Sequence, residues 1–181
     1  MTSYGIIRRG NNIQMPIKHK VFVSYHHRGD QAYYDAFSRA FHDTYDVIYD
    51  NSLERRVDSD NVDYVMRQIR ENYITGSSCT IVLVGEKTWG RKYVDWEIKA
   101  TLDKGHGLIG VQLPTAVRNP SNNNIIVPDR LFDNIQSGFA LWLSWQAITA
   151  DAAQLERYIA DAKSRSAKLI VNTRDRRLRN A

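Results

Sequence analysis

The chain has 181 residues, 43% of them hydrophobic and 25% charged, with a formal net charge of +5. These values are typical of one globular domain, and no apolar run has the length of a membrane-spanning helix. The first residues lack the apolar core of a secretory signal, and a single cysteine, Cys79, excludes an internal disulfide framework. We therefore expect a cytoplasmic protein with no membrane association.

The first part of the chain contains two predicted strands. Residues 20–25 form the first, and the polar loop after it ends at Asp30, a suitable N-cap for a helix through residues 33–41. Residues 45–49 predict the second strand. The loop that follows, residues 50–58, is long and charged, and loops of this length are often functional. We expect it to be mobile or to contact a second copy of the chain.

The remainder of the chain continues the alternation of helices and strands. Its predicted elements are, in order, a helix ending at Gly76, a fully apolar strand (80–84), a helix up to Leu102, two further strands (108–113 and 139–145) and a last helix (155–162). Residues 114–137 contain three of the four prolines and predict an irregular insertion with a helical turn around Leu131.

Two carboxylates of the helix that ends near Leu102 have different neighbours along the chain. Asp95 has Arg91 and Lys99 at the i±4 positions, which predicts an ordinary solvated residue. Glu97 has Tyr93 and Thr101 there instead, so no cation is within reach along the helix. From spacing alone, Glu97 is either a structural carboxylate at the boundary of the core or a functional one.

Five buried runs alternating with helices predict an α/β fold, a flavodoxin-like doubly wound parallel sheet of five strands with helices on both faces. In the strand order 2-1-3-4-5, ligands bind where the first and third strands diverge, beyond their carboxyl ends. The loops at that point are residues 25–30 and 85–93. We expect three segments: an N-terminal extension (1–19), the domain itself (20–170) and a basic C-terminal tail (171–181).

Several chemistries lack their residues. The first strand is followed by SYHHRGD rather than a glycine-rich phosphate-binding loop, and no Gly-x-Ser-x-Gly nucleophile motif occurs. One cysteine and scattered histidines cannot form a zinc site, and the adjacent His26 and His27 point apart on an extended chain, so we expect no metal. The arginines of the tail have no interleaved aromatic residues, which favours a solvated tail over a nucleic-acid site.

Two segments carry a family resemblance. The segment VFVSYHHRGD resembles the opening motif of TIR (Toll/interleukin-1 receptor) domains, and TIVLVGEKTWGRKYVDWEIKA resembles their catalytic segment, an apolar strand followed by an aromatic residue and Trp-x-x-x-Glu. The resemblance covers residues 20–112 and is closest to the TIR-like proteins of bacterial Thoeris antiphage systems. It implies an enzyme that cleaves NAD⁺ as substrate, with no further cofactor, and forms ADP-ribose or a cyclic variant as a messenger for a separate effector protein.

The same resemblance implies roles for individual residues. Glu97 occupies the position of the catalytic glutamate, and Tyr93 occupies a position where the family usually has Trp. The residues expected to contact the substrate are Ser24, Tyr25, His26, Arg28, Trp89 and Tyr93. The loop 50–58 corresponds to a mobile loop that covers the site and joins subunits into a homo-oligomer.

Two other functions are compatible with the fold. Many TIR domains are interaction modules without activity, in which case Glu97 is structural. A receiver domain needs an acidic cluster after the first strand and a phospho-acceptor Asp after the third. Here those strands end in Ser24-Tyr25 and Val84-Gly85, which argues against a receiver.

Overall fold

The computed structural model describes residues 19–43, 45–48 and 62–181. Its strands form one sheet in the order β2-β1-β3-β4-β5, and every neighbouring pair is parallel. The strands are β1 (His19–Ser24), β2 (Tyr45–Ile48), β3 (Cys79–Val84), β4 (Gly107–Gln112) and β5 (Leu141–Ser144). The predicted α/β class, with a parallel sheet flanked by helices, is confirmed, and β3 lies at its centre.

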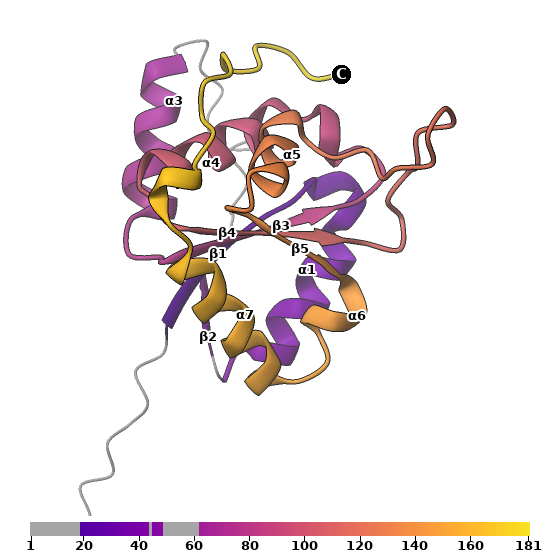
Figure 1. The fold of residues 1–181 in the computed structure, drawn as a ribbon. Coiled ribbons are helices and arrows are strands. Elements are labelled where there is room, and N and C mark those ends of the chain that lie inside the picture. Colours follow the sequence, from indigo (N-terminus) through magenta and orange to yellow (C-terminus); the bar gives the residue numbers. More distant parts are fainter. Residues whose placement is uncertain (1–18, 44, 49–61) are drawn as a thin grey trace, which may run out of the picture.

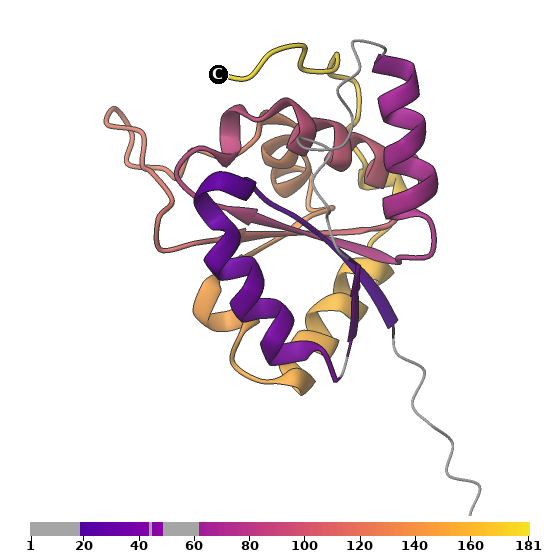
Figure 2. The same ribbon diagram turned by 180° about the vertical axis from the view of Figure 1, so that it is seen from behind.

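Helices cover both faces of the sheet (Figures 1 and 2). One face packs against α1 (His27–Phe41), α6 (Trp145–Ile148) and α7 (Ala152–Ser164). The other packs against α3 (Val62–Gln68) with its π-helical continuation η1 (Ile69–Ile74), α4 (Lys92–Asp103) and α5 (Asp129–Gln136). The described residues also form two short 3₁₀ turns, η2 (Thr88–Gly90) and η3 (Ala167–Leu169).

The core is divided by the sheet because side chains alternate along each strand. In β3, Ile81 and Leu83 pack toward α1 and α7, whereas Val82 and Val84 pack toward α4 and α5. All six residues of β3 are buried, which explains its mainly apolar sequence, and the hydroxyl of Thr80 forms a hydrogen bond with that of Thr101. Cys79 is a core residue, as the sequence predicts, and burial raises the pKa of its thiol to about 12.

Three local predictions need correction. The first helix begins at His27 with His26 as N-cap, so Asp30 lies inside its first turn and is buried. The insertion 114–137 contains a full helix, α5, rather than one turn. Asp95 is only 8% exposed, because Arg130 of α5 is placed against it by the tertiary fold.

Other segments lie outside the described residues. They include the N-terminal extension up to residue 18 and the loop 50–58, so the expected mobility and intersubunit contact of that loop stay predictions. Among the described helices, none combines the length and apolar character needed to cross a membrane.

Candidate active site

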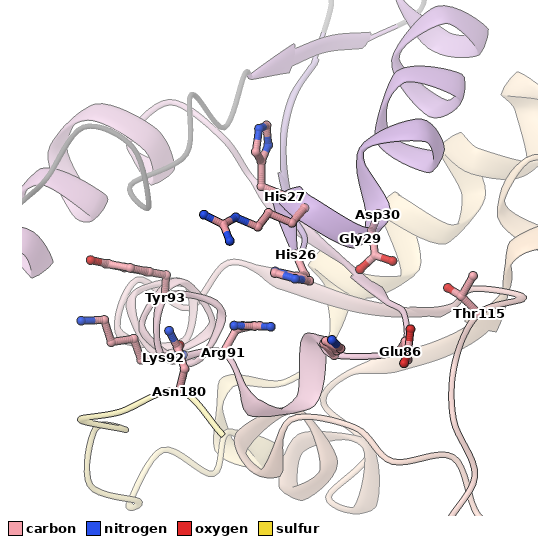
Figure 3. A pocket seen from close by; sticks show the side chains of 12 residues that line it. His26, His27, Gly29, Asp30, Glu86, Arg91, Lys92, Tyr93, Thr115 and Asn180 are labelled. Carbon is pink, nitrogen blue, oxygen red and sulfur yellow. The ribbon is translucent and has the colours of Figure 1, made fainter.

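A cleft of about 770 Å³ opens at the carboxyl ends of β1 and β3, where the strand order predicts a ligand site (Figure 3). The loop after β1 and the start of α1 supply one side. The loop after β3 and the start of α4 supply the other. The residues that line the cleft are His26, His27, Arg28, Gly29, Asp30, Glu86, Lys87, Arg91, Lys92, Tyr93, Thr115 and Asn180.

The cleft is predominantly cationic. Four Lys or Arg side chains line it against two carboxylates, Asp30 and Glu86. The helices α1 and α4 both begin at the cleft, and neither N-cap residue accepts a side-chain hydrogen bond from its helix. Within the described part of the chain, the buried Nε of Arg91 has no hydrogen-bond partner. Helix N-termini and guanidinium groups favour anions, so the cleft is suited to a ligand that carries phosphate.

Glu97 is buried beside the end of β1. Its side chain is 2% exposed, and the hydroxyl of Ser24 donates a hydrogen bond of 2.5 Å to Oε2 of Glu97. Ser24 can reach it because alternation along β1 turns this residue toward α4. Tyr93, one helical turn before Glu97, lines the cleft, whereas Glu97 itself is not among the described lining residues.

The sequence-predicted residues divide into two groups. His26, Arg28 and Tyr93 line the cleft together, and Ser24 contacts Glu97. Tyr25 and Trp89 lie elsewhere, on the opposite face of the sheet and in a second hollow. The topology therefore brings five of the seven predicted residues to one region at the carboxyl edge of the sheet.

Tyr25 points to the opposite face of the sheet. Its ring stacks on Tyr34 of α1 at 4.7 Å between centroids, and its hydroxyl donates to Oε1 of Gln31 at 3.0 Å. Alternation explains this position, because consecutive residues of an extended chain point to opposite sides and Ser24 occupies the α4 side. Tyr25 is consequently a core residue in this structure.

Trp89, in η2, lines a second hollow of about 300 Å³. Its neighbours there include Asp129 of α5 and three residues of the tail, Arg174, Asp175 and Arg177. Trp89 and Tyr93 therefore do not line the same cleft, although the sequence places both near the substrate.

Asp30 is a site feature that the sequence analysis did not identify. It lines the cleft at 2% exposure and joins the two loops, because Thr88 Oγ1 donates to Asp30 Oδ2 at 2.9 Å and accepts from the Gly85 amide at 2.9 Å. A Cβ at position 85 would lie 2.0 Å from Asp30 Oδ1, which explains the glycine. Burial raises the pKa of the Asp30 carboxyl above its usual range; hydrogen bonds from Thr88 and the His26 backbone oppose this shift, and Glu86 adds to it.

Asp95 and Arg130 form a buried ion pair on the far side of α4. Arg130 is fully buried, and its Nε donates to Asp95 Oδ1 at 2.9 Å. The spacing along α4 pointed instead to Arg91 and Lys99, which is wrong because a partner 35 residues away displaces them. The sequence of α5, DRLFDNIQ, contains one arginine in a largely polar segment and gave no signal of this pair.

Most side chains of the tail, including those of Arg174 and Arg179, are exposed as predicted, but its backbone packs against α4 and α5. Trp96 Nε1 donates to the carbonyl of Arg177 at 2.8 Å, and the amide of Arg177 donates to Asp95 Oδ2 at 2.9 Å. Arg174 pairs with Asp133 of α5. Backbone polar groups that follow no regular element still need partners, and here α4 and α5 supply them.

No three His, Cys, Asp or Glu side chains come close enough to hold a metal ion in the described ranges, 19–43, 45–48 and 62–181. The described residues at this edge of the sheet supply a buried carboxylate, the aromatic ring of Tyr93 and a cationic cleft.

Comparison with known proteins gives one family. The family model described as Thoeris protein ThsB, TIR-like domain, matches residues 22–118, more than half of the chain. The match runs from β1 past β4 and includes Ser24, Tyr93 and Glu97. No curated protein matches the chain. The α/β fold, the cleft at the end of β1 and β3 and this match lead to one conclusion: the chain belongs to the TIR-like domain family of the Thoeris protein ThsB.

Proposed function

We propose that this protein cleaves NAD⁺ in bacterial Thoeris antiphage defence, releasing nicotinamide and forming ADP-ribose or a cyclic ADP-ribose-type messenger. Family membership supports the role in Thoeris. The observation that carries the chemistry is the buried Glu97 carboxylate. It is held by Ser24 at the end of β1, one helical turn from a cleft that Tyr93 lines.

The reaction suits a single carboxylate. When the bond between ribose C1′ and the nicotinamide nitrogen breaks, its electron pair stays with nicotinamide, which leaves as a neutral molecule and needs no proton. Glycosidases that expel an alkoxide need a second carboxyl group as general acid. The remaining requirement is to stabilise the cationic ribose, and a fixed carboxylate in a buried position does this. Glu97 supplies that group.

The ribose cation is then captured by a nucleophile. Water gives ADP-ribose and releases one proton, whereas attack by a group of the same molecule gives a cyclic product and excludes water from the step. Tyr93 offers a flat aromatic surface for the nicotinamide ring at the wall of the cleft. NAD⁺ is the substrate in this scheme, and the proposal requires no other cofactor.

The cleft matches the rest of NAD⁺. Arg28, Lys87, Arg91 and Lys92 surround it, and two helix N-termini face it, which suits the two negative charges of a pyrophosphate. Its volume of about 770 Å³ lies within the range of small-molecule sites. His26 and Arg28 from the loop after β1 are the groups we assign to substrate binding, together with Tyr93.

The proposal extends to location and partners. We propose a cytoplasmic enzyme whose product is sensed by a separate effector protein, and a homo-oligomer formed through the loop 50–58. Size-exclusion chromatography with light scattering, with and without NAD⁺, tests the oligomer. A variant that shortens this loop then shows whether the loop is required.

One observation favours a second function, a TIR-type interaction module without activity. Glu97 accepts a hydrogen bond from Ser24, and it is not among the described residues that line the cleft. Both properties are expected of a structural carboxylate. In this case the surfaces of the domain, rather than Glu97, carry its role.

A single assay separates the two functions. The protein is incubated with NAD⁺, and nicotinamide and the nucleotide product are resolved by chromatography, beside Glu97→Ala and the exposed control Glu156→Ala of α7. Nicotinamide release by wild type and the control, but not by Glu97→Ala, supports the enzyme. Folded wild-type protein that releases no nicotinamide, alone or with phage-infected cell extract, contradicts it and leaves the interaction module.

A further inference from the structure

The tail lies along the outside of α4 (Figure 1), and its residue Asn180 lines the cleft. Its contacts run from Asn172, whose amide donates to Asp103 at the end of α4, to Asn180 at the beginning of the same helix. The tail therefore follows nearly the whole length of the helix that carries Tyr93 and Glu97. The family match ends at residue 118, so it does not include this segment.

Arg130 is the anchor of the tail. Its guanidinium donates to Oδ1 of Asn172 at 2.6 Å and to the carbonyls of Arg174 and Asp175 at 3.0 Å each, while Nε binds Asp95. A fully buried arginine with this many partners holds its segment in one position, because any displacement leaves a buried cation short of acceptors. The tail is therefore fixed relative to α4 and α5.

Asn180 stands where the tail meets the cleft (Figure 3). Its Oδ1 accepts the amide proton of Lys92, the first residue of α4, at 2.9 Å. The N-cap residue Arg91 offers no side-chain acceptor, and Asn180 supplies one for the first of the amides that have no partner within the helix. Next to it, the amide of Ala181 donates to the carbonyl of Gly90 at 2.9 Å.

The tail approaches the backbone of Gly90 closely. A Cβ at position 90 would lie 2.9 Å from the Cβ of Ala181 and 3.1 Å from its carbonyl oxygen. A larger residue at position 90 would therefore push the tail away from the start of α4. The residue at position 90 and the tail fit each other at the edge of the cleft.

We infer that the tail contributes Asn180 to the lining of the cleft and that Asn180 is a positioning residue of the site, capping the first turn of α4 from a segment far away in the chain. Through that turn Asn180 fixes Tyr93 at the cleft wall. Asn180 itself needs no contact with a reacting atom for this role.

Amide hydrogen exchange of the full chain tests the cap without any substrate. Three variants are compared: Asn180→Ala removes the acceptor, Asn180→Asp keeps it, and Thr173→Ala is an exposed control in the same segment. We expect the Lys92 amide to exchange about 3- to 30-fold faster in Asn180→Ala, as for loss of a helix cap, and at wild-type rate in the other two. Equal protection of Lys92 in Asn180→Ala and wild type overturns the inference.

Kinetics test the positioning role, which rests on the proposed function. We expect Asn180→Ala to raise KM for NAD⁺ about 3- to 10-fold with a smaller change in kcat, and Thr173→Ala to change neither. An unchanged KM in a variant whose Lys92 amide has lost protection overturns the positioning role. If wild type releases no nicotinamide, the proposed function fails, and the exchange experiment alone decides whether Asn180 holds α4.

Discussion

The carboxylates on the two sides of α4, Asp95 and Glu97, have different hydrogen-bond partners. On one side, Asp95 is paired with the fully buried Arg130 and also accepts the amide of Arg177. On the other, Glu97 is 2% exposed and accepts a hydrogen bond from the neutral hydroxyl of Ser24. The two residues are two positions apart in the chain. The sequence neighbours of Asp95 predict a solvated carboxylate, whereas the structure buries it.

The comparison shows what a buried carboxylate can be used for. A charge that a buried guanidinium already neutralises holds elements together, and removing its partner leaves an uncompensated ion. A buried carboxylate one helical turn from the wall of a cleft can instead stabilise a cationic transition state there. Asp95 therefore organises α4, α5 and the tail, and Glu97 is the candidate for chemistry.

The largest effect is expected on the Asp95 side. Arg130→Ala leaves Asp95 buried without its cation and releases Asn172 and two carbonyls of the tail, so we expect a loss of about 3–5 kcal/mol in unfolding free energy. Urea unfolding at pH 7 measures it. The exposed Arg157→Ala of α7 is the control and should change stability by less than about 0.5 kcal/mol. A similar small change in both variants would mean that the pair does not hold the tail.

Substitution of Glu97 should change the rate of NAD⁺ turnover rather than the stability of the protein. Glu97→Gln keeps the size and hydrogen-bonding capacity of the side chain and removes its charge. We expect NAD⁺ turnover to fall about 10²–10³-fold with a nearly unchanged melting temperature. Asp95→Asn should show the reverse, a lower melting temperature with turnover retained by the folded protein.

The control for this pair is Glu156→Gln, which is exposed on the opposite face of the sheet. Wild-type turnover in a folded Glu97→Gln variant would remove the distinction between the two carboxylates. It would also favour the interaction module over the enzyme.

Removing the hydroxyl of Ser24 tests whether its hydrogen bond holds Glu97 in place. Ser24→Ala takes away the donor to Glu97 in a site where both residues are almost fully buried. We expect a loss of about 1–3 kcal/mol in unfolding free energy, the cost of a buried acceptor left short of a donor. Guanidinium unfolding measures it, with the exposed Ser121→Ala as control. Stability at the wild-type level would show that this hydrogen bond does not hold Glu97.

The smallest effect concerns Asp30, a third buried carboxylate, which has a hydroxyl partner like Glu97. Burial raises the pKa of its carboxyl, so the folded state binds the proton more tightly than the unfolded state does. Asp30 therefore makes stability fall as pH rises from the usual pKa of 3.8 through the higher folded pKa. The stability of wild type relative to Asp30→Asn should therefore fall as the pH rises through this window. A relative stability that rises with pH would contradict a raised pKa.

The sequence by itself determined the features that depend on local pattern. Buried apolar runs alternating with amphipathic helices gave the parallel sheet, and the strand order placed His26, Arg28 and Tyr93 at one cleft. Cys79 was recognisable as a core residue because it adjoins a fully apolar strand. These predictions succeed because periodicity and topology set which side of an element a residue occupies.

Only the tertiary structure decided the contacts between segments far apart in the chain. Arg130 reaches Asp95 across 35 residues, and Asn180 reaches Lys92 across 88. The sequence around one partner gives no indication of the other. The spacing along α4 therefore predicted a solvated Asp95, which is wrong. Tyr25 and Trp89 were misplaced for a related reason. The loop residues next to a strand end can face either side of the sheet, and packing against α1 or the tail settles which side they take.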